Sequence, residues 1–211
     1  VNMNHSSTHA RTLRLVQMAL LTALMLLLQL ALGGLRIGPV TLSFSLVPLV
    51  IAAVLIGPGA GALLGLVSGA VTYIWQVLPA ADPFYALLIA TNPLVTALIC
   101  VSKTTLAGLL AGLCYRAICK ISKYRALNVI LPAAVCPIIN TGIFCLGMYF
   151  GFGSALQSSK VFGAAASAGL VSFILIGLAG INFICELLTN VVICPIICKA
   201  LYSTKYFKTD K

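Results

Sequence analysis

The sequence predicts an all-α integral membrane protein with six transmembrane helices. Hydrophobic residues make up 61% of its 211 residues, charged residues make up 8%, and the mean hydropathy is +1.13. Only three residues are acidic, which is too few for a surface in water. The segment from Thr41 to Trp75 contains no charged residue, and an uncharged segment of this length is typical of helices in lipid or inside a membrane bundle.

We interpret that uncharged segment as two helices joined by a tight turn. It is interrupted by Gly57-Pro58-Gly59, where proline removes a backbone N–H and glycine permits positive φ, so the tripeptide favours a sharp turn between antiparallel helices. After the turn, glycines recur every four residues, at Gly61, Gly65 and Gly69. This spacing puts them on one helix face, where small residues let another helix approach closely. We expect the other helices to pack around this hairpin.

Spans of about 20 residues divide the chain into six helices and leave no room for a soluble domain. We expect a polar N-terminal tail at residues 1–12, a transmembrane domain at residues 13–201 and a basic C-terminal tail at residues 202–211. No small-residue cleavage motif follows the first tail, so we expect the first helix to be retained. The expected helices lie near residues 13–33, 46–57, 60–77, 92–115, 127–150 and 170–201, with the longer connections at 34–45, 78–91 and 151–169.

The basic residues predict the orientation of the chain. Ten of them fall on one side of the six spans, two fall on the other side, and Lys103 lies within a span. Because cytoplasmic loops carry an excess of Lys and Arg, we expect a multi-pass protein of the plasma membrane with both termini in the cytoplasm. The net charge of +10 then needs no nucleic acid to explain it. The ten are Arg11, Arg14, Arg116, Lys120, Lys123, Arg125, Lys199, Lys205, Lys208 and Lys211, and the two are Arg36 and Lys160.

The connections on the outer side carry polar groups to the expected mouth of the bundle. Arg36 lies in the first of these connections and Asp82 in the second, among hydroxyl, proline and aromatic residues. A mostly apolar cavity with a few placed polar groups is typical of a small-molecule site. The alternative is that these loops are polar only because loops in general are, and composition does not separate the two interpretations.

Charged and amide side chains also lie deep within the spans. Lys103 and Glu186 are expected at similar depths in the fourth and sixth spans, where an unpaired charge is costly. We therefore predict that they pair with each other or share a water-filled cavity. Asn182 and Asn190 flank Glu186 by about one helical turn each, and Asn140-Thr141 adds polar groups to the fifth span. Two interpretations stay open, which are contact with a ligand and a buried polar clasp between spans four to six.

The sequence carries no motif for catalysis or for a cofactor. Its two histidines, His5 and His9, lie in the N-terminal tail, and neither HExxH, GxSxG nor the phosphate-binding GxxxxGK[ST] pattern is present. The eight cysteines include no Cys-x-x-Cys pair and are interpreted as reduced, apolar packing residues. We expect that the protein is not an enzyme and binds neither metal nor cofactor, and that any energised work is done by another subunit.

Five segments follow one another in an order that is similar to a known family. They are Ala19-x-x-x-Ala23, Phe44-Ser-Leu-Val-Pro48, Leu55-Ile-Gly-Pro58 with the glycine ladder, Asn140-Thr-Gly142, and Asn182-Phe-Ile-Cys-Glu186 with Asn190 and Pro195. In this order they resemble the substrate-binding S components of energy-coupling factor (ECF) vitamin transporters, in the folate, riboflavin and pantothenate branch. The resemblance covers almost the whole chain.

The resemblance implies an S-component-like bundle that binds a vitamin or related small molecule from outside. The cavity would be made by helices 4 to 6, the first connection and the connection between the third and fourth spans. The partners would be a transmembrane coupling subunit and two ATPase subunits that hydrolyse ATP, so the S component itself would need no cofactor. Ala19 and Ala23, which by themselves indicate only ordinary helix packing, would dock on the coupling subunit. The implied ligand residues are Phe44, Asn92, Lys103, Asn140, Asn182 and Glu186.

For the ligand, the preference is pantothenate over riboflavin or folate. Few aromatic side chains besides Trp75, Phe84 and Tyr85 are available to stack on a flavin or pterin ring. Two other classes of function stay open. A stand-alone secondary transporter would usually contain inverted repeats and broken helices around coupling groups. A membrane assembly protein would need no cavity, and a ligand that stays bound through purification would count against it.

Overall fold

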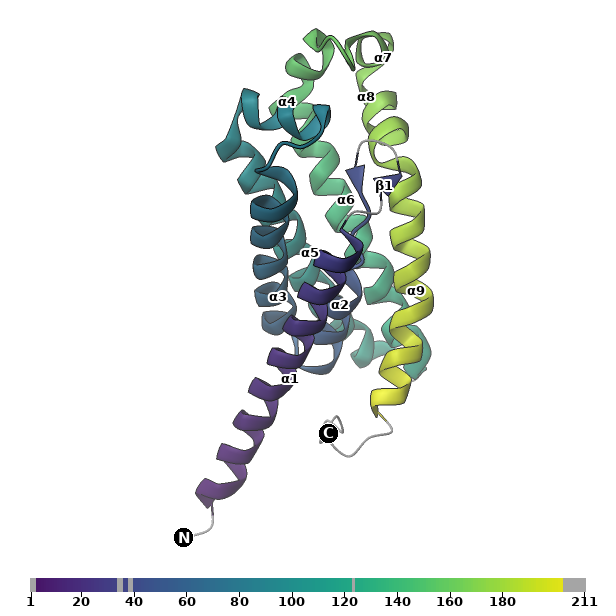
Figure 1. Ribbon diagram of the computed structural model, residues 1–211. Helices are drawn as coiled ribbons and strands as arrows, with labels where there is room; N and C mark the ends of the chain where they lie inside the picture. Colours follow the sequence, from purple (N-terminus) through teal and green to yellow (C-terminus); the bar gives the residue numbers. More distant parts are fainter. Residues whose placement is uncertain (1–2, 34–35, 38–39, 123, 203–211) are drawn as a thin grey trace.

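The protein is a bundle of long helices around one short buried helix (Figure 1). The computed structural model describes residues 3–33, 36–37, 40–122 and 124–202. Within these residues, five helices are long and apolar enough to cross a membrane by length and composition. This confirms the predicted all-α membrane bundle. The five are α1 (Met3–Leu32), α3 (Pro58–Val71) with its π-helical continuation η1 (Thr72–Val77), α5 (Pro93–Ile121), α6 (Arg125–Ser158) and α9 (Gly180–Tyr202).

A further apolar helix, α2 (Leu46–Leu55), forms the centre of the bundle. It has only 10 residues, and nine of them, Leu46 to Val54, are buried. It packs against α1, α3, α5, α6 and α9. The outward surface, by contrast, carries large apolar side chains such as Leu15, which is 71% exposed, and Ile176, which is 75% exposed. Such a surface is stable when lipid solvates it.

The predicted glycine ladder forms the contact between α3 and α5. A Cβ added at Gly61 would lie 2.6 Å from the carbonyl oxygen of Gly108, and one at Gly69 would lie 2.5 Å from another carbonyl oxygen of α5. At Gly65 the added atom would overlap with the carbonyl group of Thr104. The Thr104 hydroxyl donates a hydrogen bond of 2.6 Å to the Gly65 carbonyl oxygen. The two helices are therefore packed backbone against backbone, as small residues at this spacing permit.

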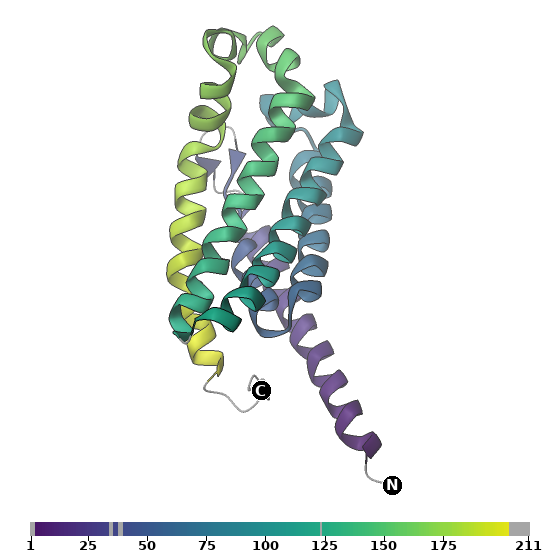
Figure 2. The same cartoon turned by 180° about the vertical axis from the view of Figure 1, so that it is seen from behind.

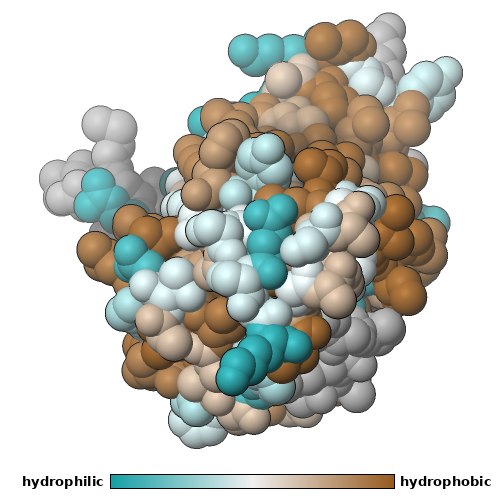
Figure 3. Space-filling model, turned by 90° about the horizontal axis from the view of Figure 1, so that it is seen from above, coloured by the Kyte–Doolittle hydropathy of each residue, from teal (hydrophilic) through white to brown (hydrophobic). Residues whose placement is uncertain are grey.

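The two ends of the bundle carry different elements. At the first, which we name the hairpin end, β1 (Arg36–Ile37) and β2 (Val40–Thr41) form an antiparallel hairpin near α4 (Pro83–Thr91) and α7 (Gly163–Ala168). At the opposite end, which we name the terminal end, α1 begins, α9 ends and α5 is followed by α6 (Figures 1 and 2). Seen from the hairpin end, polar atoms gather over the middle of the molecule and apolar side chains surround them (Figure 3).

Several boundaries differ from the sequence-based expectation. The helix expected to end near residue 150 continues as α6 to Ser158, because Phe152 and Leu156 are fully buried and keep this extra length in the bundle. The expected last helix is divided into α8 (Leu170–Ser172), the π-helical η2 (Phe173–Leu178) and α9. The connections expected at 34–45 and 78–91 contain the β-hairpin and α4. Of the predicted tails, residues 1–2 and 203–211 lie outside the described residues, and the division into tails and domain stays a prediction.

Candidate functional site

Two adjoining cavities lie between the β2 strand and helices α5, α6 and α9. We name them the Lys103 cavity and the Glu186 cavity. Because they share several lining residues, they are two halves of one site. The shared residues are Val40, Thr41, Ser43, Lys103 and Phe144; Thr72, Val77, Tyr85, Leu88, Thr96, Ile99, Cys100 and Met148 complete the first cavity, and Asn140, Thr141, Leu178, Ala179, Asn182 and Glu186 complete the second.

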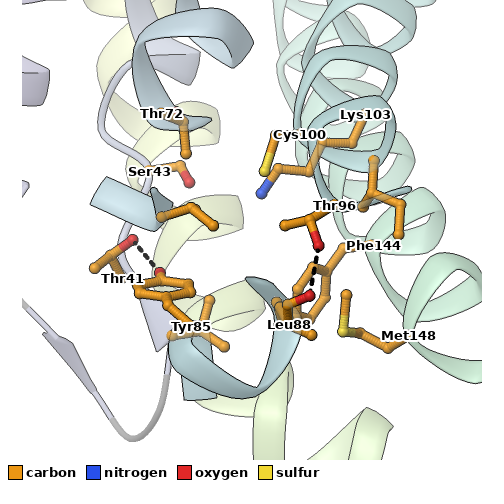
Figure 4. A pocket seen from close by; sticks show the side chains of 13 residues that line it. Thr41, Ser43, Thr72, Tyr85, Leu88, Thr96, Cys100, Lys103, Phe144 and Met148 are labelled. Carbon is orange, nitrogen blue, oxygen red and sulfur yellow. Dashed lines mark hydrogen bonds between the residues drawn. The ribbon is translucent and has the colours of Figure 1, made fainter. Parts of the chain in front are cut away.

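The side chain of Lys103 enters the first cavity from α5 (Figure 4). Its Nζ lies 5.4 Å from the centre of the Phe144 ring, a distance at which the ring face attracts a cation. Lys103 forms no ion pair within 4.0 Å with any residue that the structure describes. A cation in this position is available to an anionic group that enters the cavity.

Glu186 is the acidic group of the second cavity and is only 7% exposed. Its Oε1 accepts a hydrogen bond of 2.9 Å from the backbone N–H of Ser43. Its Oε2 accepts one of 3.5 Å from Nδ2 of Asn140. The carboxylate thus joins the segment after β2 to α6 and α9. Two hydrogen bonds reduce the cost of burying a carboxylate.

Two amide oxygens beside this carboxylate have unused acceptor capacity. Asn140 and Asn182 are 3% and 5% exposed, and neither Oδ1 accepts a hydrogen bond within the described part of the chain. The Nδ2 groups fix the two orientations, since that of Asn140 donates to Glu186 and that of Asn182 donates to the Val40 carbonyl oxygen at 3.0 Å. A buried acceptor without a donor costs about 1–3 kcal/mol. Donor groups of a ligand would remove that cost.

Thr41 closes the hairpin side of the Lys103 cavity. Its hydroxyl lies 3.1 Å from the Tyr85 hydroxyl, a hydrogen bond drawn in Figure 4, and it also donates to Oε1 of Gln76 at 3.0 Å. Burial raises the pKa of Tyr85, so its hydroxyl is neutral at physiological pH and remains able to donate or accept. These contacts join β2 to α4 and η1.

In this closed arrangement the cavities are small. Their volumes are about 30 Å³ and about 20 Å³, enough for one or two water molecules. Sites for small organic ligands have volumes of roughly 300 Å³ or more. A vitamin-sized ligand therefore fits only after some of the residues that line these cavities move apart.

The structure brings four of the predicted ligand residues together in this site, namely Lys103, Asn140, Asn182 and Glu186. Phe44 lies beside them and lines a small groove next to Glu186. The buried stripe predicted for α9 is also present, since Asn182, Glu186 and Asn190 are all buried and Cys194 and Cys198 continue the same four-residue spacing.

The other three predicted residues are placed differently. Asp82 and Asn92 cap the starts of α4 and α5, where their Oδ1 atoms accept hydrogen bonds from backbone N–H groups at 3.0 and 3.1 Å. Neither lines the Lys103 cavity or the Glu186 cavity. Asp82-Pro83 and Asn92-Pro93 are a typical pattern of a capping residue followed by proline. Arg36 lies in β1, and its side chain is outside the part of the structure that is described.

The predicted direct pair between Lys103 and Glu186 is not formed, since no ion pair within 4.0 Å joins these two described residues. Both line the Glu186 cavity instead, which is the second of the two predicted arrangements. The carboxylate is occupied by hydrogen bonds from Ser43 and Asn140, and the amine lies over Phe144. Similar depth in two helices did not determine the direction in which each side chain points.

The two predicted docking residues lie on the exposed face of α1. Ala19 and Ala23 are both exposed, whereas Leu21 and Met25 on the opposite face are buried. The N-terminal half of α1 extends away from the bundle toward the terminal end (Figures 1 and 2). Small side chains on such a face leave space for another helix to approach closely.

Thr72, Thr96 and Cys100 also line the Lys103 cavity, and the sequence did not identify them. Thr72 could have been found, because Ser68, Thr72 and Gln76 follow one another at four-residue intervals and so predict a polar face on an otherwise apolar helix. Thr96 and Cys100 carry no such signal. Their position in the site follows from the close contact between α3 and α5.

Comparison with known proteins identifies one family. The family model described as "ECF transporter, substrate-specific component" matches residues 13–198 of the chain. The match includes every helix that forms the Lys103 cavity and the Glu186 cavity. No curated protein gives a significant sequence match.

Proposed function

Because the chain belongs to the family of substrate-specific components of ECF transporters, we propose that it captures a vitamin or related small molecule from outside the cell. A transmembrane coupling subunit and two ATPase subunits then complete the import, and ATP is hydrolysed by those partners. The chain itself is the substrate-binding subunit of a transporter and is not an enzyme. It is a multi-pass membrane protein.

The position of the Lys103 amine supports a ligand with a carboxylate group. Its amine enters the cavity (Figure 4) and has no acidic partner within 4.0 Å among the described residues. A half-buried cation such as Lys103 is stabilised by an opposite charge that binds beside it. Pantothenate carries a carboxylate and is small, whereas riboflavin is an uncharged flavin. This contrast favours pantothenate.

The hydrogen-bond acceptors that line the Glu186 cavity favour a ligand whose other end carries hydrogen-bond donors. Among the residues that the structure describes, none donates to the buried Oδ1 atoms of Asn140 and Asn182, and Glu186 carries two further acceptor oxygens. Pantothenate has two hydroxyl groups and an amide N–H in addition to its carboxylate. A ligand oriented with its carboxylate toward Lys103 and its hydroxyls toward the asparagines would satisfy both halves of the site.

The arrangement of the aromatic residues favours a flavin or a pterin ligand less than it favours pantothenate. Trp75 is 65% exposed and does not line either cavity. Tyr85 and Phe144 do line the Lys103 cavity, but Phe84 packs against both of these rings and is itself 1% exposed. These rings are therefore already engaged in the packing of the bundle, which leaves little free aromatic surface for a planar ligand.

The distribution of basic residues supports an outward-facing hairpin end. Arg11 and Arg14 lie near the start of α1, Arg116 and Lys120 near the end of α5, and Lys199 near the end of α9. All these positions belong to the terminal end. Under the positive-inside rule the terminal end faces the cytoplasm. The hairpin end, whose residues Thr41 and Tyr85 line the Lys103 cavity, then faces the side from which an importer takes its substrate.

The test begins with the ligand that accompanies the protein. Mass spectrometry of protein purified without added vitamin should detect pantothenate, and calorimetry should then measure tighter binding of pantothenate than of riboflavin or folate. Lys103→Gln should weaken pantothenate binding at least tenfold, since a hydrogen bond to a charged group contributes about 1.5–3 kcal/mol. The matched control, Lys199→Gln, changes an exposed lysine at the terminal end. Tight riboflavin binding without pantothenate binding would contradict the proposal.

A further inference from the structure

The hairpin half of α1 contains a buried glutamine that the transport function does not by itself explain. Gln29 is 6% exposed, although the same face of α1 is apolar at Leu21 and Met25. Its Nε2 donates to the Ser68 carbonyl oxygen at 3.1 Å and to the Thr72 hydroxyl at 2.5 Å. The Ser68 hydroxyl lies 3.3 Å from its Oε1. Every polar atom of the side chain therefore faces α3 or η1.

The residues that hold Gln29 also belong to the wall of the substrate site. Thr72 lines the Lys103 cavity, and Figure 4 places it next to Ser43 on one side of that cavity. The Ser68 hydroxyl lies 3.1 Å from the Ser45 hydroxyl. The backbone of Ser43, two residues earlier, donates to Glu186. Glu186 is thus linked to α1 by the hydrogen bond from Ser43, the backbone of residues 43–45, and the polar contacts of Ser68 with Ser45 and Gln29.

The exposed face of α1 is the proposed docking face. Ala23 lies six residues before Gln29, a distance of about 9 Å along the helix axis, and is exposed together with Ala19. Of the other buried residues on this face, Leu21 and Met25 are apolar, and apolar contacts permit rotation and sliding more readily than hydrogen bonds do. Gln17, which is also buried, lies about three helical turns before Gln29. Gln29 is thus the side chain that fixes the hairpin half of α1 against α3 and η1 through hydrogen bonds.

We propose that Gln29 is a positioning residue that couples the substrate site to the docking face of α1. When the segment 43–45 rearranges to admit or enclose a ligand, Ser45 and Thr72 change the hydrogen bonds available to Ser68 and Gln29, and the rotation of α1 changes with them. Ligand binding thereby shifts the population of α1 orientations that the partner subunit meets. The role of the docking face rests on the proposed function, whereas the hydrogen-bonded connection itself does not.

Gln29→Leu removes this connection with little other disturbance. Leucine is similar in size and apolar, and the groups that Gln29 leaves keep partners, because the Thr72 hydroxyl donates to the Ser68 carbonyl oxygen at 2.9 Å and Ser68 retains Ser45. The matched control is Met25→Leu, one helical turn away on the same buried face. Gln29→Glu, which keeps the acceptor and loses the amide donor, provides a second variant if Gln29→Leu does not fold.

Hydrogen–deuterium exchange of the purified full chain tests the proposal in two steps. Without ligand, Gln29→Leu should speed amide exchange at residues 41–46 and in the hairpin half of α1 at least tenfold, and Met25→Leu should not. With saturating pantothenate, exchange in the original protein should slow in both regions. In Gln29→Leu it should slow only at residues 41–46. Equal protection of α1 by pantothenate in both proteins would overturn the proposal.

The two steps separate this inference from the proposed function. If pantothenate protects no segment of the original protein, the proposed ligand is wrong, and the ligand-free comparison decides the role of Gln29 by itself. The proposed role of Gln29 would then be overturned if amide exchange in Gln29→Leu and Gln29→Glu is as slow as in the original protein. In the assembled transporter, Gln29→Leu should lower maximal uptake at least fivefold and leave pantothenate affinity within about twofold, a separation that a general loss of stability would not produce.

Discussion

The interface between α3 and α5 and the interface that joins β2 to α6 and α9 are built in opposite ways. In the first, the glycines of α3 let its backbone lie directly against the backbone of α5, and an added Cβ at Gly61 would lie 2.6 Å from a facing carbonyl oxygen. In the second, polar side chains meet across small cavities, and the Oδ1 atoms of Asn140 and Asn182 lack donors within the described structure.

The difference separates a fixed half of the molecule from a responsive half. Backbone-to-backbone packing has little freedom, because the glycines have no side chain that could change rotamer to absorb a shift. The polar interface retains unsatisfied acceptors, so an arrangement that satisfies them by binding a ligand is favoured over the closed one. The α3–α5 pair therefore fixes the position of Lys103, and the polar interface of β2, α6 and α9 carries the acceptors of the Glu186 cavity.

The largest effect is expected from a change in the fixed half. Gly65→Leu should abolish the folded protein, and Gly65→Ala should destabilise it by about 1–3 kcal/mol or more, because the new Cβ overlaps with the Thr104 carbonyl group. Thermal unfolding in detergent measures this. The matched control is Gly142→Ala in α6, where an added Cβ has nothing within 4 Å; alanine there should stabilise the helix by up to about 1 kcal/mol. Equal melting temperatures for the two alanine variants would contradict the rigid interface.

The docking face should be separable from both interfaces. Ala19→Trp or Ala23→Trp should abolish ATP-dependent uptake and co-purification with the partner subunits, because a bulky side chain prevents close helix crossing. Vitamin affinity should remain within about twofold, since neither alanine lines a cavity. Leu188→Trp, at a position 58% exposed on α9, is the control. Uptake that continues in cells without any ECF partner would instead indicate a stand-alone transporter.

A change in the responsive half should affect binding more than folding. Asn182→Leu removes an acceptor that lacks a donor and also the hydrogen bond to Val40, two effects that oppose each other in the free protein. We expect the free energy of unfolding to change by less than about 1 kcal/mol and pantothenate affinity to fall about tenfold, or about 1.4 kcal/mol. Calorimetry and thermal unfolding of the same samples measure both. A large loss of stability with unchanged affinity would make Asn182 part of a structural clasp.

The smallest effect is expected for the coupling between Lys103 and Glu186. They share the Glu186 cavity without a direct pair, so neutralising both should cost less than the sum of the single changes by only about 1 kcal/mol. A double-mutant cycle with Lys103→Gln and Glu186→Gln, read by thermal unfolding, gives this value. If the effects of the two single changes add strictly, Lys103 and Glu186 are not coupled. An interaction energy of several kcal/mol would instead indicate a direct ion pair.

Features with a regular spacing could be predicted from the sequence. Gly61, Gly65 and Gly69 repeat at one helical turn and do face another helix, and Asn182, Glu186 and Asn190 form the buried stripe of α9. In both cases the period of the helix alone determines which residues share a face. The pattern does not depend on where the partner helix lies.

Features that depend on contacts distant in sequence could not be predicted. The Gly- and Ser-rich stretch after residue 150 was expected to be a connection, but burial of Phe152 and Leu156 keeps it helical. A glutamine in an apolar span gives no sign of its partners, so neither Gln29 nor Gln17 of the same span was identified. The role of Tyr85 follows from its contact with Thr41, a residue 44 positions earlier.

The most direct measurement compares two ligands in two proteins. Pantothenol has the structure of pantothenate with a neutral alcohol in place of the carboxylate. Calorimetry should find that it binds the original protein at least tenfold more weakly than pantothenate does, because it cannot pair with Lys103. In Lys103→Gln the two ligands should bind with affinities within about twofold of each other. An unchanged preference for pantothenate in Lys103→Gln would contradict the assignment of Lys103 as the group that binds the carboxylate.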